Sequence, residues 1–287
     1  MCFLRGITVL FPIFYGLIAP NSVSAQPLNA INSAIALATK LDAQLSIAIG
    51  ALQITIPNLL SSATVEDLIG NENKRSKDSA AAMRDKIADL ARKSGIPVHT
   101  ETLIGDLGQL KSRFANRARV HGLVYAEAGI PGELLGGALI EPLLFESGRP
   151  VLVVPNSYTS PISFDHVLIA WDGSASAARA VWDSIPLLRL AKTIEIVAVT
   201  GEKNLQEVPA ANTLAPMLSY LGKETRVSVI TFDGGTAAGL IMKHAAKINA
   251  GLIVQGAYGR SRWSELVLGG VTREMLREST LPVLMSH

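Results

Sequence analysis

The chain has 287 residues, which is enough for two domains of about 140 residues each. Hydrophobic residues make up 48% of the sequence and charged residues 17%, a composition typical of strands that helices bury on both faces. The net charge of +2 comes without a basic run, so no nucleic-acid partner is expected. Cys2 is the single cysteine and the five histidines lack paired ligand spacing, which excludes a disulfide framework and indicates no metal site.

Residues 1–26 allow two interpretations. They combine an arginine, an apolar stretch and a small-residue ending, as a secretory signal peptide over residues 1–25 would. Alternatively, residues 7–11 form a buried first strand of a cytoplasmic protein. Pro12 interrupts the apolar stretch and the first half otherwise lacks an opening strand, which favours the strand. No other segment approaches the ~18 uninterrupted apolar residues of a membrane-spanning helix, so no membrane partner is expected.

Strands and helices alternate through the first half. The pattern predicts a helix from Leu28, a strand at 45–52, a variable stretch at 56–73 with the turn residues Pro57, Gly70 and Asn71, an amphipathic helix at 74–93, a strand at 98–103, a helix capped by Asp106 and running to Arg119, a strand at 122–126, a helix at 141–146 and a strand at 151–154. Residues 156–163 are predicted to be a linker.

The second half repeats this plan. The pattern predicts strands at 166–171, 194–200, 226–232, 251–255 and within 281–287, and helices at 174–190, 214–221, 236–248 and after the glycines at 269–270. RPVLVVP at 149–155 aligns with LPVLMSH at 281–287, and LVYAEAGIPG at 123–132 with LIVQGAYGRS at 252–261. The two copies lie about 125 to 130 residues apart, which indicates an internal duplication with a parallel α/β sheet in each copy.

A glycine-rich stretch follows the fourth strand of the second copy. Gly256 and Gly259 come directly after an apolar run, and Gly269 and Gly270 come just before a helical pattern. A strand, a glycine turn and a helix form the order that a phosphate site needs, because glycines let N–H groups approach an anion and the helix presents its unpaired N–H groups. The alternative is a loop closed by glycines for tight packing.

A second loop is expected to face this stretch. In an open α/β sheet a ligand sits outside the carboxyl ends of the strands, where the strand order reverses. With the order 3-2-1-4-5, the loop after strand one, residues 170–174, faces Gly256 across one crevice. Asp172 would repel a phosphate, so we assign it to the base or ribose of a nucleotide, or to a divalent ion. Alternatively, Asp172 caps the following helix, although Ser174 could fill that role instead. Arg260 could add positive charge for the phosphates.

At this point the second copy resembles the universal stress protein family. The resemblance rests on a strand ending in Asp-Gly-Ser at 172–174, on Gly-x2-Gly-x9-Gly at 256–269 and on a terminal Pro-Val-Leu strand. It covers nearly all of residues 164–287 and, more weakly, residues 1–155, so the chain resembles a tandem universal stress protein with the linker 156–163 between its domains. The resemblance implies an α/β fold of two Rossmann-like (adenine nucleotide alpha hydrolase-like) domains, each a five-stranded parallel sheet of order 3-2-1-4-5 flanked by helices.

The resemblance also implies that the second domain binds ATP or a related adenine nucleotide, and the divalent ion considered for Asp172 would then be Mg²⁺. The glycines and the residues after Gly269 would hold the phosphates and ribose, and Asp172 with the backbone near Val199 would line the adenine side. The family usually has Ser or Thr directly after the third glycine, where this chain has Gly270. The candidate site residues are therefore Arg260, for its charge, and those that the resemblance implies, namely Asp172, Val199, Gly256, Gly259, Gly269, Gly270, Val271 and Thr272.

The first copy departs further from the family pattern. Its first strand is expected to run into Pro12 without Asp-Gly-Ser, and Gly129-x2-Gly132 is followed nine residues later by Pro142, which has no N–H to offer a phosphate. We therefore expect the first copy to keep the fold and to lack the site. Family members commonly pair through their fifth strands, so residues 151–154 and 283–285 are expected to pair as an intramolecular pseudo-twofold dimer, with a homodimer as a further option.

Three functions are compatible with these residues. The first is a stress-response protein that binds an adenine nucleotide and changes its assembly or partners. The second is a structural or interaction module that binds no nucleotide, with Gly270 marking a decayed site. The third is a slow ATPase, for which the sequence offers neither a G-x4-G-K-[ST] loop nor a general base other than Asp172. Binding is therefore favoured over catalysis, and no catalytic residue is assigned.

Overall fold

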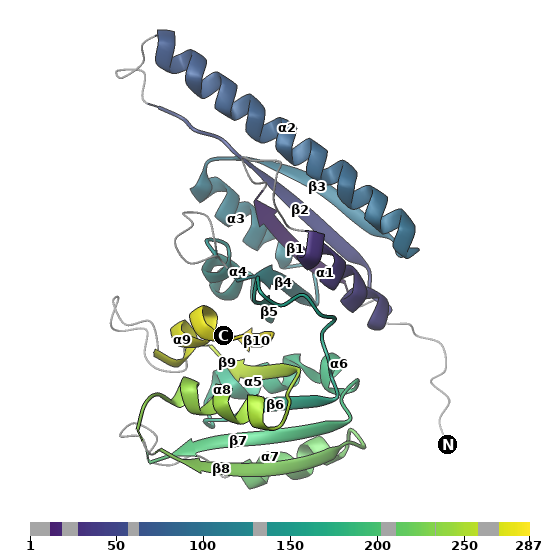
Figure 1. Cartoon of the computed structure of the whole chain (residues 1–287), viewed down its shortest axis with the longest axis vertical. Coiled ribbons are helices and arrows are strands. Elements are labelled where there is room, and N and C mark those ends of the chain that lie inside the picture. The colour runs from purple at the N-terminus through teal and green to yellow at the C-terminus, as the bar shows by residue number, and fades with distance from the viewer. Residues whose placement is uncertain are drawn as a thin grey trace.

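The computed structural model describes residues 12–18, 28–56, 63–128, 137–201, 211–232, 234–257 and 270–287, in which strands and helices alternate (Figure 1). The elements of the first half are β1 (Ile13–Ile18), α1 (Leu28–Lys40), β2 (Leu45–Leu52), α2 (Ala63–Ser94), β3 (Val98–Gly105), α3 (Leu107–Ala118), β4 (Leu123–Glu127), α4 (Ile140–Glu146) and β5 (Val151–Val154). Those of the second half are β6 (His166–Ala170), α5 (Ala175–Asp183), α6 (Ile185–Leu188), β7 (Thr193–Thr200), α7 (Ala211–Ser219), β8 (Glu224–Thr231), α8 (Ala237–Lys247), β9 (Leu252–Gly256), α9 (Gly270–Glu278) and β10 (Val283–Ser286).

The described strands form one ten-stranded sheet in the order β3-β2-β1-β4-β5-β10-β9-β6-β7-β8. Within each half the order is 3-2-1-4-5 and neighbouring strands run parallel. The predicted α/β fold class and strand order are therefore confirmed. Because β1 and β4, and likewise β6 and β9, are neighbours, each half has a strand-order reversal at the carboxyl edge of its own sheet.

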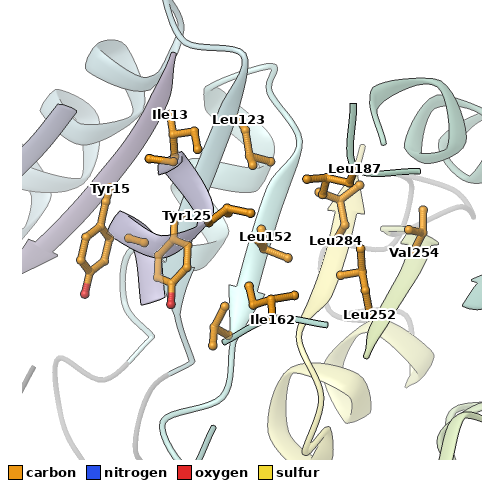
Figure 2. Packing of buried hydrophobic residues seen from close by; sticks show 14 of the residues in the cluster. Ile13, Tyr15, Leu123, Tyr125, Leu152, Ile162, Leu187, Leu252, Val254 and Leu284 are labelled. Carbon is orange, nitrogen blue, oxygen red and sulfur yellow. The ribbon is translucent and has the colours of Figure 1, made fainter. Parts of the chain in front are cut away.

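The two halves meet at one antiparallel strand pair. In the register of β5 and β10, Leu284 lies opposite Leu152, and both leucines are completely buried. Figure 2 shows these leucines among apolar side chains from both halves, with Ile162 of the connecting segment beside them. The strands predicted from the sequence to pair therefore do lie side by side.

Helices cover both faces of the sheet. One continuous apolar cluster lies beneath α1, α2, α5, α6 and α7, and the other lies beneath α3, α4, α8 and α9. Strand side chains alternate between the two clusters, so that Val254 belongs to the first and Ile253 to the second. This alternation assigns every buried strand residue to one face of the sheet.

The position of the first strand was predicted wrongly. Residues 7–11 lie outside the described part of the chain, and the strand that pairs with β2 and β4 is Ile13–Ile18, directly after Pro12. Gly16 lies in the middle of this strand, and glycine is uncommon in strands, so the sequence did not indicate a strand at this position. A Cβ on Gly16 would lie 2.8 Å from Cδ1 of Phe114, so the glycine makes room for the buried phenyl ring of α3.

Two helix boundaries were also predicted wrongly. α2 begins well before residue 74 and contains Gly70 and Asn71, which were predicted to lie in turns. The side chain of Asn73 accepts a hydrogen bond from Ile54 N at 2.8 Å and donates one to Ile54 O at 3.0 Å, which ties this part of the helix to the residues after β2. The single helix predicted for 174–190 is divided into α5 and α6, because Pro186 starts a new helix after Ser184.

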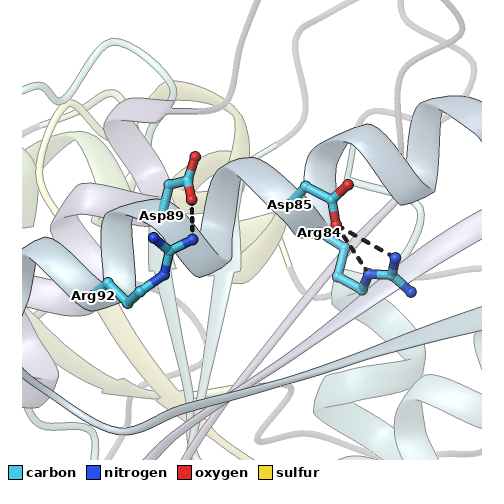
Figure 3. Close-up of polar contacts among 4 residues, drawn as sticks. All are labelled: Arg84, Asp85, Asp89 and Arg92. Atoms are coloured by element: carbon cyan, nitrogen blue, oxygen red, sulfur yellow. Dashed lines mark hydrogen bonds and ion pairs between the residues drawn. The ribbon is translucent and has the colours of Figure 1, made fainter.

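α2 presents charged side chains on its outer face. Arg84 pairs with Asp85 at 3.4 Å, and Arg92 pairs with Asp89 (Figure 3). All four side chains are exposed, so these pairs contribute little to stability and mainly keep this face solvated. No helix in the described part of the chain is long and apolar enough to cross a membrane.

A buried carboxylate connects β7, β8 and α8. Glu195 is 7% exposed, and its Oε1 accepts hydrogen bonds from Ser228 Oγ at 2.7 Å and from His244 Nε2. Burial raises the pKa of the Glu195 carboxyl, but the bonds from His244 and Ser228, with the charge of Arg226 nearby, lower it more. The net pKa therefore lies below its ordinary value of 4.5.

We predict that Leu284→Ala lowers the free energy of unfolding by about 2–5 kcal/mol, because it opens a cavity where the two halves meet. Urea denaturation followed by circular dichroism measures this loss. Val229→Ala is the matched control in an exposed strand position, since Val229 is 62% exposed, and should change the free energy by less than about 0.5 kcal/mol. Equal stability of Leu284→Ala and wild type would contradict a buried junction.

A second prediction concerns pH. The folded state holds Glu195 with a lowered pKa, so its stabilising contribution is complete above the ordinary pKa and is lost as pH falls through the folded value. Urea unfolding from about pH 7 to about pH 3 should therefore show a steeper fall in stability for wild type than for Glu195→Gln. Parallel curves for the two proteins would rule out this linkage.

Candidate functional site

The carboxyl edge of the second half brings together the turn after β6 and the end of β9. β6 and β9 are neighbours, with Ala170 opposite Gln255, so the residues after Ala170 and those after Gly256 leave the sheet at the same edge. α9 leads back into β10, which runs parallel to β9, so its first turn also lies toward this edge. The strand-order reversal, the turn after β6 and the start of a helix therefore converge.

The turn after β6 tests one of the two roles left open for Asp172, that of a helix cap. Its Oδ1 accepts a hydrogen bond from Ser174 N at 3.0 Å, and Gly173 between them has a φ of 72°. Ser174 is the N-cap of α5, where its Oγ accepts from Ala177 N at 3.1 Å. Asp172 therefore shapes the turn but does not cap the helix, and its carboxylate is exposed at the sheet edge.

Gly256 makes a tight packing contact. A Cβ on this residue would lie 2.4 Å from Ala177 N and 2.6 Å from Ser176 Oγ, in the first turn of α5. Its φ is not in the left-handed region, so the turn conformation that favours glycine does not apply here. The packing alternative therefore explains Gly256: glycine lets the end of β9 approach the first turn of α5.

The residues at the start of α9 differ in exposure. A Cβ on Gly270 would meet no atom within 4 Å, and Gly270 and Val271 are both exposed. Thr272 is 3% exposed and points into the protein. Since the first N–H groups of a helix have no partner within it, Gly270 and Val271 offer backbone donors toward the carboxyl edge.

The other predicted site residues are divided between the described and undescribed parts of the chain. Val199 lies at the carboxyl end of β7, is 5% exposed and belongs to the α8 and α9 face of the sheet. Gly259, Arg260 and Gly269 lie outside the described residues. In the described part of the chain, no group of three or more His, Cys, Asp or Glu side chains could hold a metal ion.

Gln255 is a polar residue at this edge that the sequence analysis counted only as part of a strand. It is 3% exposed, and neither side-chain amide atom has a hydrogen-bond partner within the described part of the chain. Its neighbours across the strands are Ala170 and Met285, both on the α8 and α9 face. The signal in the sequence is one amide in the apolar run Leu-Ile-Val-Gln-Gly.

The first half has different chemistry at the equivalent positions. The register of β4 with β5, compared with that of β9 with β10, places Glu127 where the second half has Gly256. Tyr15 OH donates a hydrogen bond to Glu127 Oε2 at 3.3 Å. Burial raises the pKa of Tyr15 well above its ordinary value, with Glu127 adding to the shift, so the phenol remains a neutral donor. A carboxylate at this position disfavours a phosphate.

Comparisons with known proteins show a family similarity in the second half and a known fold over the whole chain. Residues 163–287 match the model of the universal stress protein family. A curated universal stress protein from Synechocystis sp. is 29% identical over 150 residues, which cover 52% of this chain and 50% of that protein. The match therefore spans half the length of this relative.

Two solved structures cover nearly the whole chain. A universal stress protein from Archaeoglobus fulgidus DSM 4304 has a TM-score of 0.64 at 17% identity, covering 95% of this chain and 97% of that one. A protein of unknown function from Pseudomonas aeruginosa PAO1 has a TM-score of 0.57 at 16% identity, covering 97% of this chain and 92% of that one. These likenesses establish the fold of the chain, and residues 163–287 match the universal stress protein family model.

Proposed function

We propose that the chain is a tandem universal stress protein that binds ATP or a related adenine nucleotide in its second half. The observation that carries this proposal is the convergence of the Asp172 turn and the start of α9 at the reversal between β6 and β9. The family match of residues 163–287 supports it. The proposed domains are residues 1–155 and 164–287, joined by the linker 156–163.

The residues at this edge divide between the two ends of a nucleotide. The N–H groups of Gly270 and Val271 at the positive end of α9 suit the phosphates, together with Gly259, Arg260 and Gly269 of the preceding segment. Thr272 contributes through its backbone, because its side chain points inward. Asp172 and the edge of β7 near Val199 suit the base and ribose, and Asp172 could also hold Mg²⁺ beside a phosphate.

The first half serves as a scaffold that binds no nucleotide. Glu127 places negative charge at its strand-order reversal, and Pro142 in the first turn of α4 offers no N–H. The β5 and β10 pair makes the two halves a pseudo-dimer within one chain. Nucleotide binding then acts by changing further assembly or partner binding, and turnover is not part of this proposal.

A second candidate function is a structural module that binds no nucleotide. Two observations favour it: Gly256 is explained by packing against α5, and Gly270 stands where a hydroxyl residue would add a phosphate ligand. This candidate predicts that ATP leaves the melting temperature of the chain unchanged. Nucleotide binding predicts a rise that grows with ATP concentration.

We predict that Gly270→Asp abolishes ATP binding while the fold is kept. A side chain at residue 270 has open space, and a carboxylate at a helix start stabilises the helix but repels the phosphates. Gly270→Asn has the same shape without the charge and is the matched control, which should still bind. Calorimetric titration of the full chain with ATP and Mg²⁺ measures the affinity of both variants. Absence of binding by wild type at millimolar ATP would contradict the proposed function.

Gly256→Ala should show a different pattern. Its Cβ would overlap Ala177 N, so we predict a loss of stability of at least about 1–3 kcal/mol. Urea denaturation without nucleotide measures this loss. Gly108→Ala is the control, since a Cβ there would come no closer than 3.4 Å to a neighbouring atom. If Gly256→Ala is as stable as wild type, the packing role assigned to Gly256 is wrong.

A further inference from the structure

We propose that the side-chain amide of Gln255 reads the polar edge of the bound base and thereby selects adenine. This inference rests on the proposed function, because it assigns one group of the same site. Four features of Gln255 support this role: its burial, the lack of a partner for its amide among the described residues, its position in the sheet and its counterpart in the first half.

The unpaired amide is the first observation. Both Nε2 and Oε1 are buried, and neither has a partner in the described residues. A buried donor or acceptor without a partner lowers stability, whereas an apolar side chain of the same shape would not. Methionine has nearly the same length as glutamine and would fit beside Ala170 and Met285. An amide at this position is therefore unfavourable for folding alone, which indicates a binding role.

The position in the sheet is the second observation. Gln255 precedes the last residue of β9 and shares the α8 and α9 face with Ala170 and Val199. Asp172 follows Ala170 by two residues, so Gln255 lies at the same edge of the sheet as the residues assigned above to the base. Its side-chain amide offers both a donor and an acceptor, and neither has a partner in the described part of the chain.

The first half provides an internal comparison. In the register of the two halves Ala126 corresponds to Gln255, and Ala126 is buried in the same apolar cluster. The first half, which has Glu127 at its strand-order reversal, thus has the apolar Ala126 at this position. The second half, which has no carboxylate there, has the amide of Gln255. The amide therefore occurs together with the edge that can accept a nucleotide.

The chemistry of the amide fits adenine. The 6-amino group of adenine donates a hydrogen bond, and a neighbouring ring nitrogen accepts one, so a single amide can satisfy both. This pair loses the hydrogen bond to the amide oxygen when the 6-amino group is absent, and the oxygen is again left without a partner. A base analogue that lacks this group therefore separates a contact to the base from a contact to ribose or phosphate.

The test compares wild type with Gln255→Met as full chains. We expect the melting temperature without nucleotide to rise by about 2–4 °C, because an unpaired buried amide is removed. We expect the affinity for ATP, measured by calorimetry, to fall about tenfold to about a hundredfold. For purine riboside triphosphate, which lacks the 6-amino group, the two proteins should differ by less than about threefold.

Ser286→Ala is the matched control. Ser286 is also buried with an unpaired hydroxyl, but it lies opposite Gly256 on the other face of the sheet. Its replacement should raise the melting temperature without changing ATP affinity. A loss of ATP affinity in Ser286→Ala similar to that in Gln255→Met would overturn the inference, because the effect would then come from the sheet itself.

The outcomes separate this inference from the proposed function. If wild type binds ATP and Gln255→Met binds it equally well, or loses the same factor with both nucleotides, the assignment of Gln255 to the base is wrong and the nucleotide site stands. If wild type binds no ATP, the proposed function fails, and Gln255 has no base to read. Gln255→Leu provides a second apolar replacement if the methionine variant does not fold.

Discussion

The antiparallel hydrogen bonding of β5 with β10 is the constraint on which the rest of the structure depends. Each strand would otherwise be an exposed apolar edge of a five-stranded sheet. Pairing covers both edges at once, and all residues of both strands are buried. Because the pair is antiparallel, the carboxyl edges of the two halves face opposite ways. The start of β5 thus lies beside the end of β10, where Phe145 of α4 packs on His287 with ring centroids 4.9 Å apart.

The same scaffold therefore carries two edges with different chemistry. At one edge Glu127 accepts a hydrogen bond from the buried Tyr15, while at the other the equivalent residue is Gly256 and the end of β9 touches the first turn of α5. The glycines near the second edge also divide by role: Gly256 is required for packing, whereas Gly270 has space around it. The exposed Gly270, and not Gly256, is the position at which binding can be tested without changing the core.

Most of the fold could be predicted from the sequence, because buried parallel strands are apolar runs and helix caps such as Asp106 and Thr236 have clear signatures. The errors came from contacts across the chain. Gly16 makes sense only beside the ring of Phe114, and Asn73 extends α2 through its bonds to Ile54. In the site, the glycine pattern and Asp172 were visible as motifs. The unpaired amide of Gln255 could not be predicted from the sequence, since its burial depends on the register of β9 between β6 and β10.

The central claim is that one chain holds one adenine nucleotide, in its second half. Native mass spectrometry of the full chain titrated with ATP and Mg²⁺ tests it most directly, because it counts ligands on each molecule. The account predicts a single bound nucleotide that saturates at one per chain and disappears in Gly270→Asp. Two nucleotides per chain would contradict the assignment of the first half as a scaffold, and no bound nucleotide in wild type would contradict the account as a whole.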